Sequence, residues 1–193
     1  MFMRDWKKEV FTIPNLLSLF RLALIPVYMA VYLNAVLPWH YYLAGGILAL
    51  SCLTDAVDGQ VARHFHMVSN LGKVLDPFAD KITQFTLTLC LSLRYRALGP
   101  VLLIFLVKEL FQLIAGVVNL RRGKMLPGAL FAGKLCTTVL FVSFILLVLL
   151  PDLPESIVDT LAFLDCLFLI FSFAGYLSAY LSRNGKMQDI ENS

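Results

Sequence analysis

Six long apolar stretches constrain this chain more than any other feature of its sequence. They cover residues 13–36, 41–62, 71–92, 100–120, 127–150 and 157–181. A helix needs about 20 mostly apolar residues to cross a bilayer core, and each stretch is long enough. The composition agrees, because 59% of the 193 residues are hydrophobic and 15% are charged, whereas soluble domains are about 25% charged. The sequence predicts an all-α integral membrane protein with six transmembrane helices.

The positions of Lys and Arg between these stretches predict the orientation, because cytoplasmic loops carry an excess of basic residues. With the N-terminus in the cytoplasm, the inner segments hold Arg4, Lys7, Lys8, Arg63, Arg121, Arg122, Lys124, Arg183 and Lys186. The outer segments then hold only Arg94 and Arg96. We therefore expect both termini to be cytoplasmic.

The remaining segments predict three parts of the chain. Residues 1–12 are expected to form a short amphipathic segment at the membrane interface, residues 13–182 the six-helix domain, and residues 183–193 a cytoplasmic tail. No cleavage site follows the first apolar stretch, so we interpret it as a retained helix rather than a signal peptide. A net charge of +3 is too small to indicate a nucleic-acid partner. A bacterial plasma membrane is the expected location.

Four aspartates flank the short polar segment between the second and third stretches. Asp55 and Asp58 are spaced i, i+3, and Asp76 and Asp80 are spaced i, i+4, so each pair shares one helical face. Carboxylates in a membrane helix are costly, at about 2.5–3.5 kcal/mol for Asp near the centre, and four together would also repel one another. A divalent cation such as Mg²⁺ or Mn²⁺ removes this repulsion, and Mg²⁺ commonly shares its coordination with substrate phosphates.

The residues between the aspartates suit a phosphate-bearing ligand. Gly59 allows a ligand to approach the backbone, Arg63 offers a permanently charged forked donor, and Gly72 lies where the amides of a first helical turn are still available to an anion. The alternative is that the aspartates are solvated interface residues with no joint role.

The complete pattern Asp55-x-x-Asp58-Gly59-x-x-Ala62-Arg63, eight residues, Gly72-x-x-x-Asp76-x-x-x-Asp80 resembles the signature of the CDP-alcohol phosphatidyltransferase family. The resemblance implies a metal-dependent membrane enzyme that transfers a phosphatidyl group from CDP-diacylglycerol to an alcohol and releases CMP. It implies a two-metal centre of Mg²⁺ or Mn²⁺ on Asp55, Asp58, Asp76 and Asp80, with Asp80 as the catalytic base. It also implies CDP contacts from Gly59, Ala62, Arg63, Ser69 and Gly72, an active site at the cytoplasmic face, and a homodimer.

The signature does not specify the acceptor. The segment from Ile13 to Arg21 and the later Gly133-Lys134-x-x-Thr137 resemble bacterial phosphatidylglycerophosphate synthases, which favours glycerol 3-phosphate. They also resemble CMP-forming cardiolipin synthases, whose acceptor is phosphatidylglycerol. Because glycerol 3-phosphate is a dianion, we expect Arg21 and Lys134 to contact its phosphate. Lys108 is a further candidate within a stretch, or else pairs with Glu109.

Two other classes of function remain open from the sequence. Intramembrane carboxylates also form cation pathways, so a cation transporter or channel is the alternative outside enzymes. Against it, the aspartates gather at one interface and the chain shows no internal repeat of the kind many transporters have. Among enzymes, another CDP-alcohol phosphotransferase with a different acceptor is the alternative. Asp165 lies deep in the sixth stretch. A partner within the bundle is the one explanation that the sequence offers for it, and its role stays open.

Overall fold

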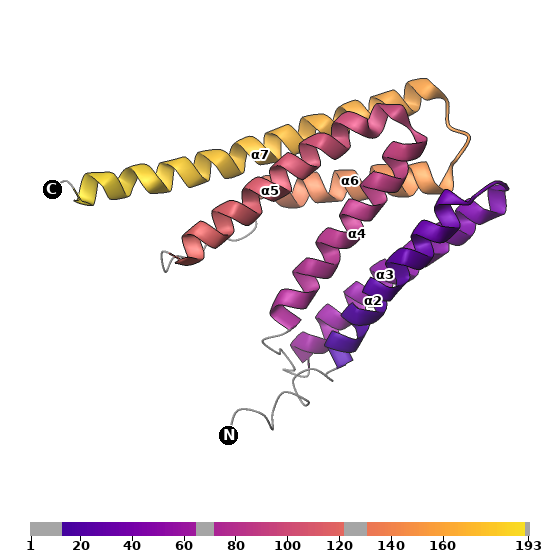
Figure 1. Ribbon diagram of the computed structural model, residues 1–193, viewed down its shortest axis with the longest axis horizontal. Helices are drawn as coiled ribbons and strands as arrows, with labels where there is room; N and C mark the ends of the chain where they lie inside the picture. The colour runs from indigo at the N-terminus through magenta and orange to yellow at the C-terminus, as the bar shows by residue number, and fades with distance from the viewer. Residues whose placement is uncertain (1–12, 65–71, 122–130, 192–193) are drawn as a thin grey trace. The chain divides into compact units, whose positions relative to one another are not determined.

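The computed structural model describes residues 13–64, 72–121 and 131–191. Their helices, shown in Figure 1, are α2 (Ile13–Leu33), α3 (Pro38–His64), α4 (Gly72–Arg94), the 3₁₀ turn η1 (Arg96–Leu98), α5 (Gly99–Arg121), α6 (Phe131–Leu149) and α7 (Glu155–Glu191). Each predicted stretch corresponds to one α-helix, and the described ranges contain no strand. The all-α class is confirmed. The interfacial segment 1–12 lies outside the described residues.

The turn between α2 and α3 is shorter than the sequence predicted. We expected the second helix to begin after His40, but α3 begins at Pro38. Proline suits the first helical position, where its missing N–H has no partner to lose. The backbone N–H groups of Val36 and Leu37 donate to His40 Nδ1 at 3.3 and 3.1 Å. The imidazole therefore caps the start of α3, a role that the sequence did not suggest.

The last helix is longer than predicted. The sixth apolar stretch ends at residue 181, but α7 continues to Glu191 and is 37 residues long. Loss of hydrophobicity does not by itself end a helix. Ends are usually marked by a capping residue or a following proline, and no proline occurs between Ser182 and Glu191.

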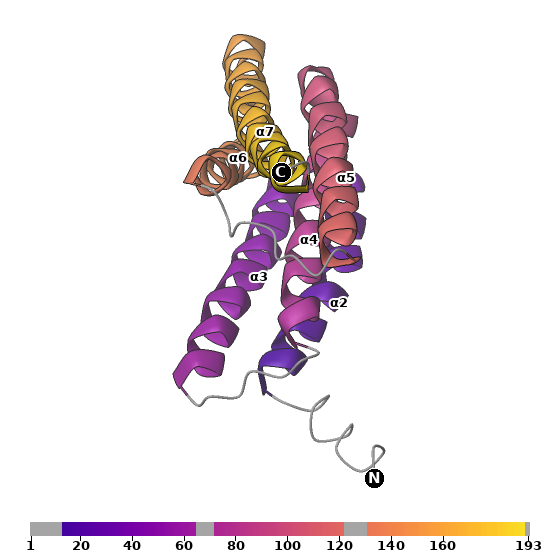
Figure 2. The same cartoon turned by 90° about the vertical axis from the view of Figure 1, so that its left-hand side faces the viewer.

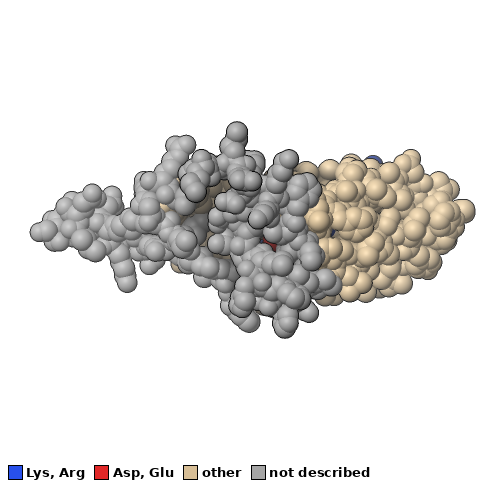
Figure 3. All heavy atoms as spheres, turned by 90° about the horizontal axis from the view of Figure 1, so that it is seen from below, with Lys and Arg blue, Asp and Glu red and all other residues tan. Residues whose placement is uncertain are grey.

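Four segments of the described structure are long and apolar enough to cross a membrane: Asn15–Leu33, Arg96–Asn119, Ala132–Leu149 and Glu155–Ser178. Large apolar side chains such as Phe163 and Leu103 are about two-thirds exposed, which lipid explains and water does not. The described atoms on the face in Figure 3 are almost all uncharged. The chain is a multi-pass membrane protein. The count of six crossings and the location of the termini stay predictions.

The helices form two compact units, of which the first comprises Met1–Cys90 with Val148–Pro151. It contains α2, α3 and most of α4 (Figure 2). Tyr28 stacks on Tyr32 with ring centres 5.6 Å apart, and Tyr32 meets Tyr41 edge-on at 5.8 Å. These rings join α2 to α3 at the end of each helix farther from the aspartates.

The second unit comprises Leu91–Leu147 and Asp152–Ser193, with α5, most of α6, and α7. Phe111 of α5 packs edge-on against Phe173 of α7, with ring centres 5.2 Å apart. Asp165, fully buried, accepts a hydrogen bond of 2.9 Å from Ser143 Oγ of α6. Ser143 is therefore a partner of Asp165 within the bundle, a contact that the sequence left open.

Candidate active site

The signature occupies the end of α3 and the start of α4. Asp55 and Asp58 lie in the last turns of α3, and α4 begins at Gly72. Asp76 and Asp80 follow one helical turn apart near the start of α4. The backbone therefore places both pairs on helical segments, as the spacing predicted, with residues 65–71 between them.

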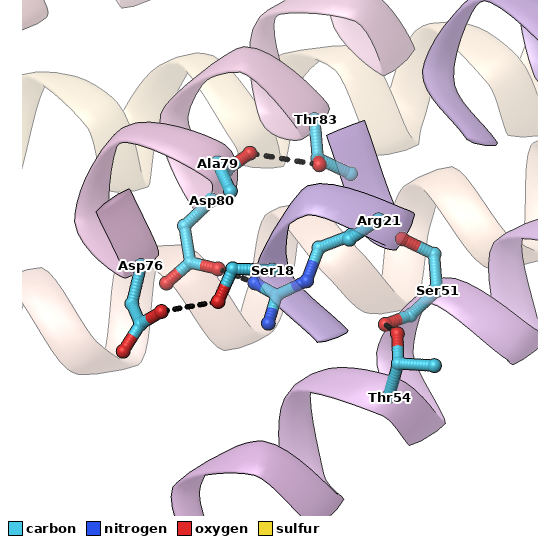
Figure 4. Close-up of polar contacts among 8 residues, drawn as sticks. All are labelled: Ser18, Arg21, Ser51, Thr54, Asp76, Ala79, Asp80 and Thr83. Atoms are coloured by element: carbon cyan, nitrogen blue, oxygen red, sulfur yellow. Dashed lines mark hydrogen bonds and ion pairs between the residues drawn. The ribbon is translucent and has the colours of Figure 1, made fainter. Parts of the chain in front are cut away.

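Helix α2 supplies a polar face that contacts the second pair of aspartates. Ser18 and Arg21 are 0% and 2% exposed. Ser18 Oγ donates a hydrogen bond to Asp76 Oδ1, and Arg21 Nη1 forms an ion pair with Asp80 Oδ1 (Figure 4). The Asp80 side chain is nevertheless 55% exposed.

Helix α3 meets α2 and α4 directly beneath this pair. A cavity of about 20 Å³ is lined by Leu24, Ile25 and Tyr28 of α2, Ile47, Leu48 and Ser51 of α3, and Thr83, Thr86 and Leu87 of α4. Ser51 precedes Asp55 by one turn, and Thr83 follows Asp80 by one turn. From this cavity, Asp55 therefore lies one turn onward along α3, and Asp80 lies one turn back along α4.

The described side chains fit a divalent metal by the chemistry of their donors. Carboxylate oxygens are hard ligands, and Mg²⁺ is commonly held by one or two carboxylates together with substrate phosphates. Asp76 and Asp80 present two carboxylates on one face of α4. Within the described residues no three His, Cys, Asp or Glu side chains gather as a metal site. The side chains of Asp55 and Asp58, the other half of the predicted centre, are not among those described.

The other predicted site residues are placed to different extents. Gly59, Ala62 and Arg63 lie on the last turns of α3, and Ser69 lies outside the described residues. Lys134 is exposed, one turn into α6.

Lys108 is 6% exposed and its Nζ lies 2.8 Å from Glu109 Oε1. Of the two interpretations of Lys108, the internal pair with Glu109 is the one observed.

Residues 11–175 match the family described as CDP-alcohol phosphatidyltransferase. The chain belongs to this family. A CMP-forming cardiolipin synthase of Streptomyces coelicolor is 35% identical over 145 residues, which cover 73% of this chain and 66% of that protein. A CDP-diacylglycerol–glycerol-3-phosphate 3-phosphatidyltransferase of Aquifex aeolicus is 36% identical over 137 residues, 70% of this chain and 73% of that protein.

The relatives of this CDP-alcohol phosphatidyltransferase family member also include longer proteins. A cardiolipin synthase and mitochondrial hydrolase fusion protein of Schizosaccharomyces pombe is 36% identical over 125 residues. The matched region spans 20% of that protein and just under two thirds of the Streptomyces enzyme. The relatives are thus named for two different reactions. The sequence motifs resembled the same two kinds of enzyme.

The polar face of α2 is the part of the site that sequence reasoning missed in this family member. The sequence predicts Arg21 as an acceptor contact. It gives no role to Ser18 or to Asn15, which is 1% exposed. A signal was present, because Asn15, Ser18 and Arg21 recur at intervals of three residues. Polar residues three apart in an otherwise apolar helix share one face.

Proposed function

We propose that this chain transfers the phosphatidyl group of CDP-diacylglycerol to a hydroxyl of glycerol 3-phosphate, with release of CMP. The observation that carries the proposal is the arrangement of Asp76 and Asp80. Both project from one face of α4 toward α2, and Asp80 keeps more than half of its side chain exposed. An anchored yet accessible carboxylate suits a base that must meet a reactant.

In the proposed reaction Asp80 accepts the proton of the acceptor hydroxyl while the oxygen of that hydroxyl attacks the phosphatidyl phosphorus. The bond between that phosphorus and the CMP oxygen breaks in line, and CMP leaves with the bonding electron pair. Mg²⁺ or Mn²⁺ held by Asp55, Asp58, Asp76 and Asp80 would supply charge neutralisation at the diphosphate. The nucleotide would be held by the residues of the signature, Gly59, Ala62, Arg63, Ser69 and Gly72.

The acceptor needs a cation that it can reach. Lys134, which is exposed on α6, is one cation that we assigned to the phosphate of glycerol 3-phosphate from the sequence. Arg21 is the other cation that we assigned to this phosphate from the sequence. The reaction is proposed for the cytoplasmic face of the plasma membrane and for a homodimer.

A CMP-forming cardiolipin synthase is the second candidate, favoured by the similarity to the Streptomyces protein of that name. Its acceptor, phosphatidylglycerol, shares a phosphorylated glycerol with a free hydroxyl, so the same base and the same cation serve it. The two candidates differ in the route of the acceptor, which reaches the site from water in one case and from the bilayer in the other.

The test is a reaction of the purified protein with CDP-diacylglycerol and Mg²⁺ or Mn²⁺ in mixed micelles. Glycerol 3-phosphate, phosphatidylglycerol, serine and inositol phosphate are offered separately, and CMP release and the lipid product are followed. We expect CMP release with glycerol 3-phosphate and its loss on chelation with EDTA. Release with phosphatidylglycerol alone would identify the second candidate. No release with any acceptor, together with cation flux in liposomes, would identify a transporter.

A further inference from the structure

We propose that Ser18 and Arg21 of α2 are positioning residues, which fix the carboxylates of Asp76 and Asp80. Arg21 then acts on the reaction through Asp80 and not through the phosphate of the acceptor. The inference rests on the proposed function insofar as the two aspartates are taken to bind metal and accept the proton. It replaces the role that the sequence suggested for Arg21.

The register of the two helices carries this inference. Ser18 and Arg21 are three residues apart on α2, and the carboxylates they contact are four residues apart on α4. These spacings correspond to rises of about 4.5 and 6 Å along a helix. Both contacts advance in the same chain direction, so the helices run parallel here and meet as two successive rungs. A single contact between the helices would not need matching spacings on α2 and α4, whereas two successive contacts do.

The difference in burial between Arg21 and Asp80 indicates that the arginine positions the aspartate. Arg21 is 2% exposed, whereas the Asp80 side chain is 55% exposed. A guanidinium this deeply buried presents little surface to the phosphate of an acceptor. The arginine instead lies inside the helix bundle with its charge directed at Asp80 (Figure 4).

Each donor contacts one oxygen of its carboxylate. Such a contact restrains the rotation of the carboxylate and so the direction of its other oxygen. Charge-assisted hydrogen bonds to a planar guanidinium are among the stronger polar contacts. Partners that orient metal-binding groups typically change metal affinity or activity by about 10–100-fold when they are removed.

The experiment compares Arg21→Ala, Arg21→Lys, Ser18→Ala and Ser18→Thr with two controls at exposed positions, Arg96→Ala and Ser156→Ala. The first readout is Mn²⁺ affinity in the presence of CDP, measured by electron paramagnetic resonance. The second is kcat and KM for the acceptor from CMP release. Thermal unfolding in detergent identifies variants that fold.

For Arg21→Ala and Ser18→Ala we expect Mn²⁺ affinity or kcat to fall by about 10–100-fold, with the KM for the acceptor within about twofold of the wild type. Ser18→Thr keeps the hydroxyl and should restore both quantities, and Arg21→Lys keeps the charge without the fork and should restore them in part.

The proposal is overturned if Arg21→Lys and Arg21→Ala raise the acceptor KM about tenfold while kcat and Mn²⁺ affinity stay at the wild-type values. It is equally overturned if Ser18→Ala matches Ser156→Ala in every readout. Should Arg21→Ala fail to fold, Arg21→Lys and the Ser18 pair still decide. The Mn²⁺ measurement needs no turnover, so a wild type that releases no CMP would count against the proposed function alone.

Discussion

At the scale of single residues, Asp80 is the group on which the proposed chemistry depends. Asp80→Asn keeps an oxygen that accepts from Arg21, so the variant should fold, but an amide cannot take up the proton of the acceptor. We expect CMP release to fall by about 10²–10⁴-fold while binding of CDP changes little. CMP release and equilibrium binding of labelled CDP measure the two effects. Asp159→Asn, at an exposed position on α7, is the control, and wild-type turnover by Asp80→Asn would remove Asp80 from the mechanism.

Asp165 and Ser143 give a second prediction at this scale. Ser143→Ala removes the donor at 2.9 Å from Asp165 Oδ1 and leaves a fully buried carboxyl group without it. Leaving a buried polar group unsatisfied costs about 1–3 kcal/mol, which unfolding in detergent should detect. Asp165→Asn keeps the acceptor oxygen and carries no charge, so it should be tolerated. If Asp165→Asn lowered the stability more than Ser143→Ala did, the hydrogen bond would not be what stabilises this pair.

At the scale of helices, the packing of α6 on α7 depends on a glycine. A Cβ atom at Gly133 would lie 2.8 Å from the hydroxyl and 3.2 Å from Cε2 of Tyr176. We expect Gly133→Ala to lower the unfolding midpoint because the aromatic ring must move, and Tyr176→Leu to relieve the effect in the double variant. Gly46→Ala is the matched control, since nothing lies within 4 Å of its added Cβ. Additive effects of the two substitutions would exclude a contact between them.

The same scale shows what the sequence could and could not predict. Hydrophobic length located every described α-helix, because a run of about 20 apolar residues is typical of a helix in lipid. It could not locate the end of α7, where the chain stays helical after it becomes polar. Nor could it identify Ser18 as a donor to Asp76, since this contact joins residues 58 apart in the chain. The spacing of the four aspartates predicted shared faces, but the partner helix α2 depends on tertiary packing.

At the scale of the whole molecule, the excess of basic residues on one side predicts that Arg96 faces outward and the C-terminal end of α7 faces the cytoplasm. In a variant whose four cysteines are replaced by alanine, a cysteine at Arg96 should react with a membrane-impermeant maleimide added to intact cells. A cysteine at Gln188 should react only after the membrane is permeabilised. The reverse pattern would invert the topology and place the aspartates outside.

The pairing of Arg21 with Asp80 has a consequence for how the protein is made. Their positions are 59 residues apart, and a ribosome adds about 5–20 residues per second, so roughly 3–12 s separate the synthesis of the two charges. During that interval α2 holds a cation whose insertion into lipid costs about 2.5–3.5 kcal/mol near a helix centre. We therefore expect α2 to stay beside the insertion machinery until α4 emerges, so that the yield of this protein in the membrane depends on that retention.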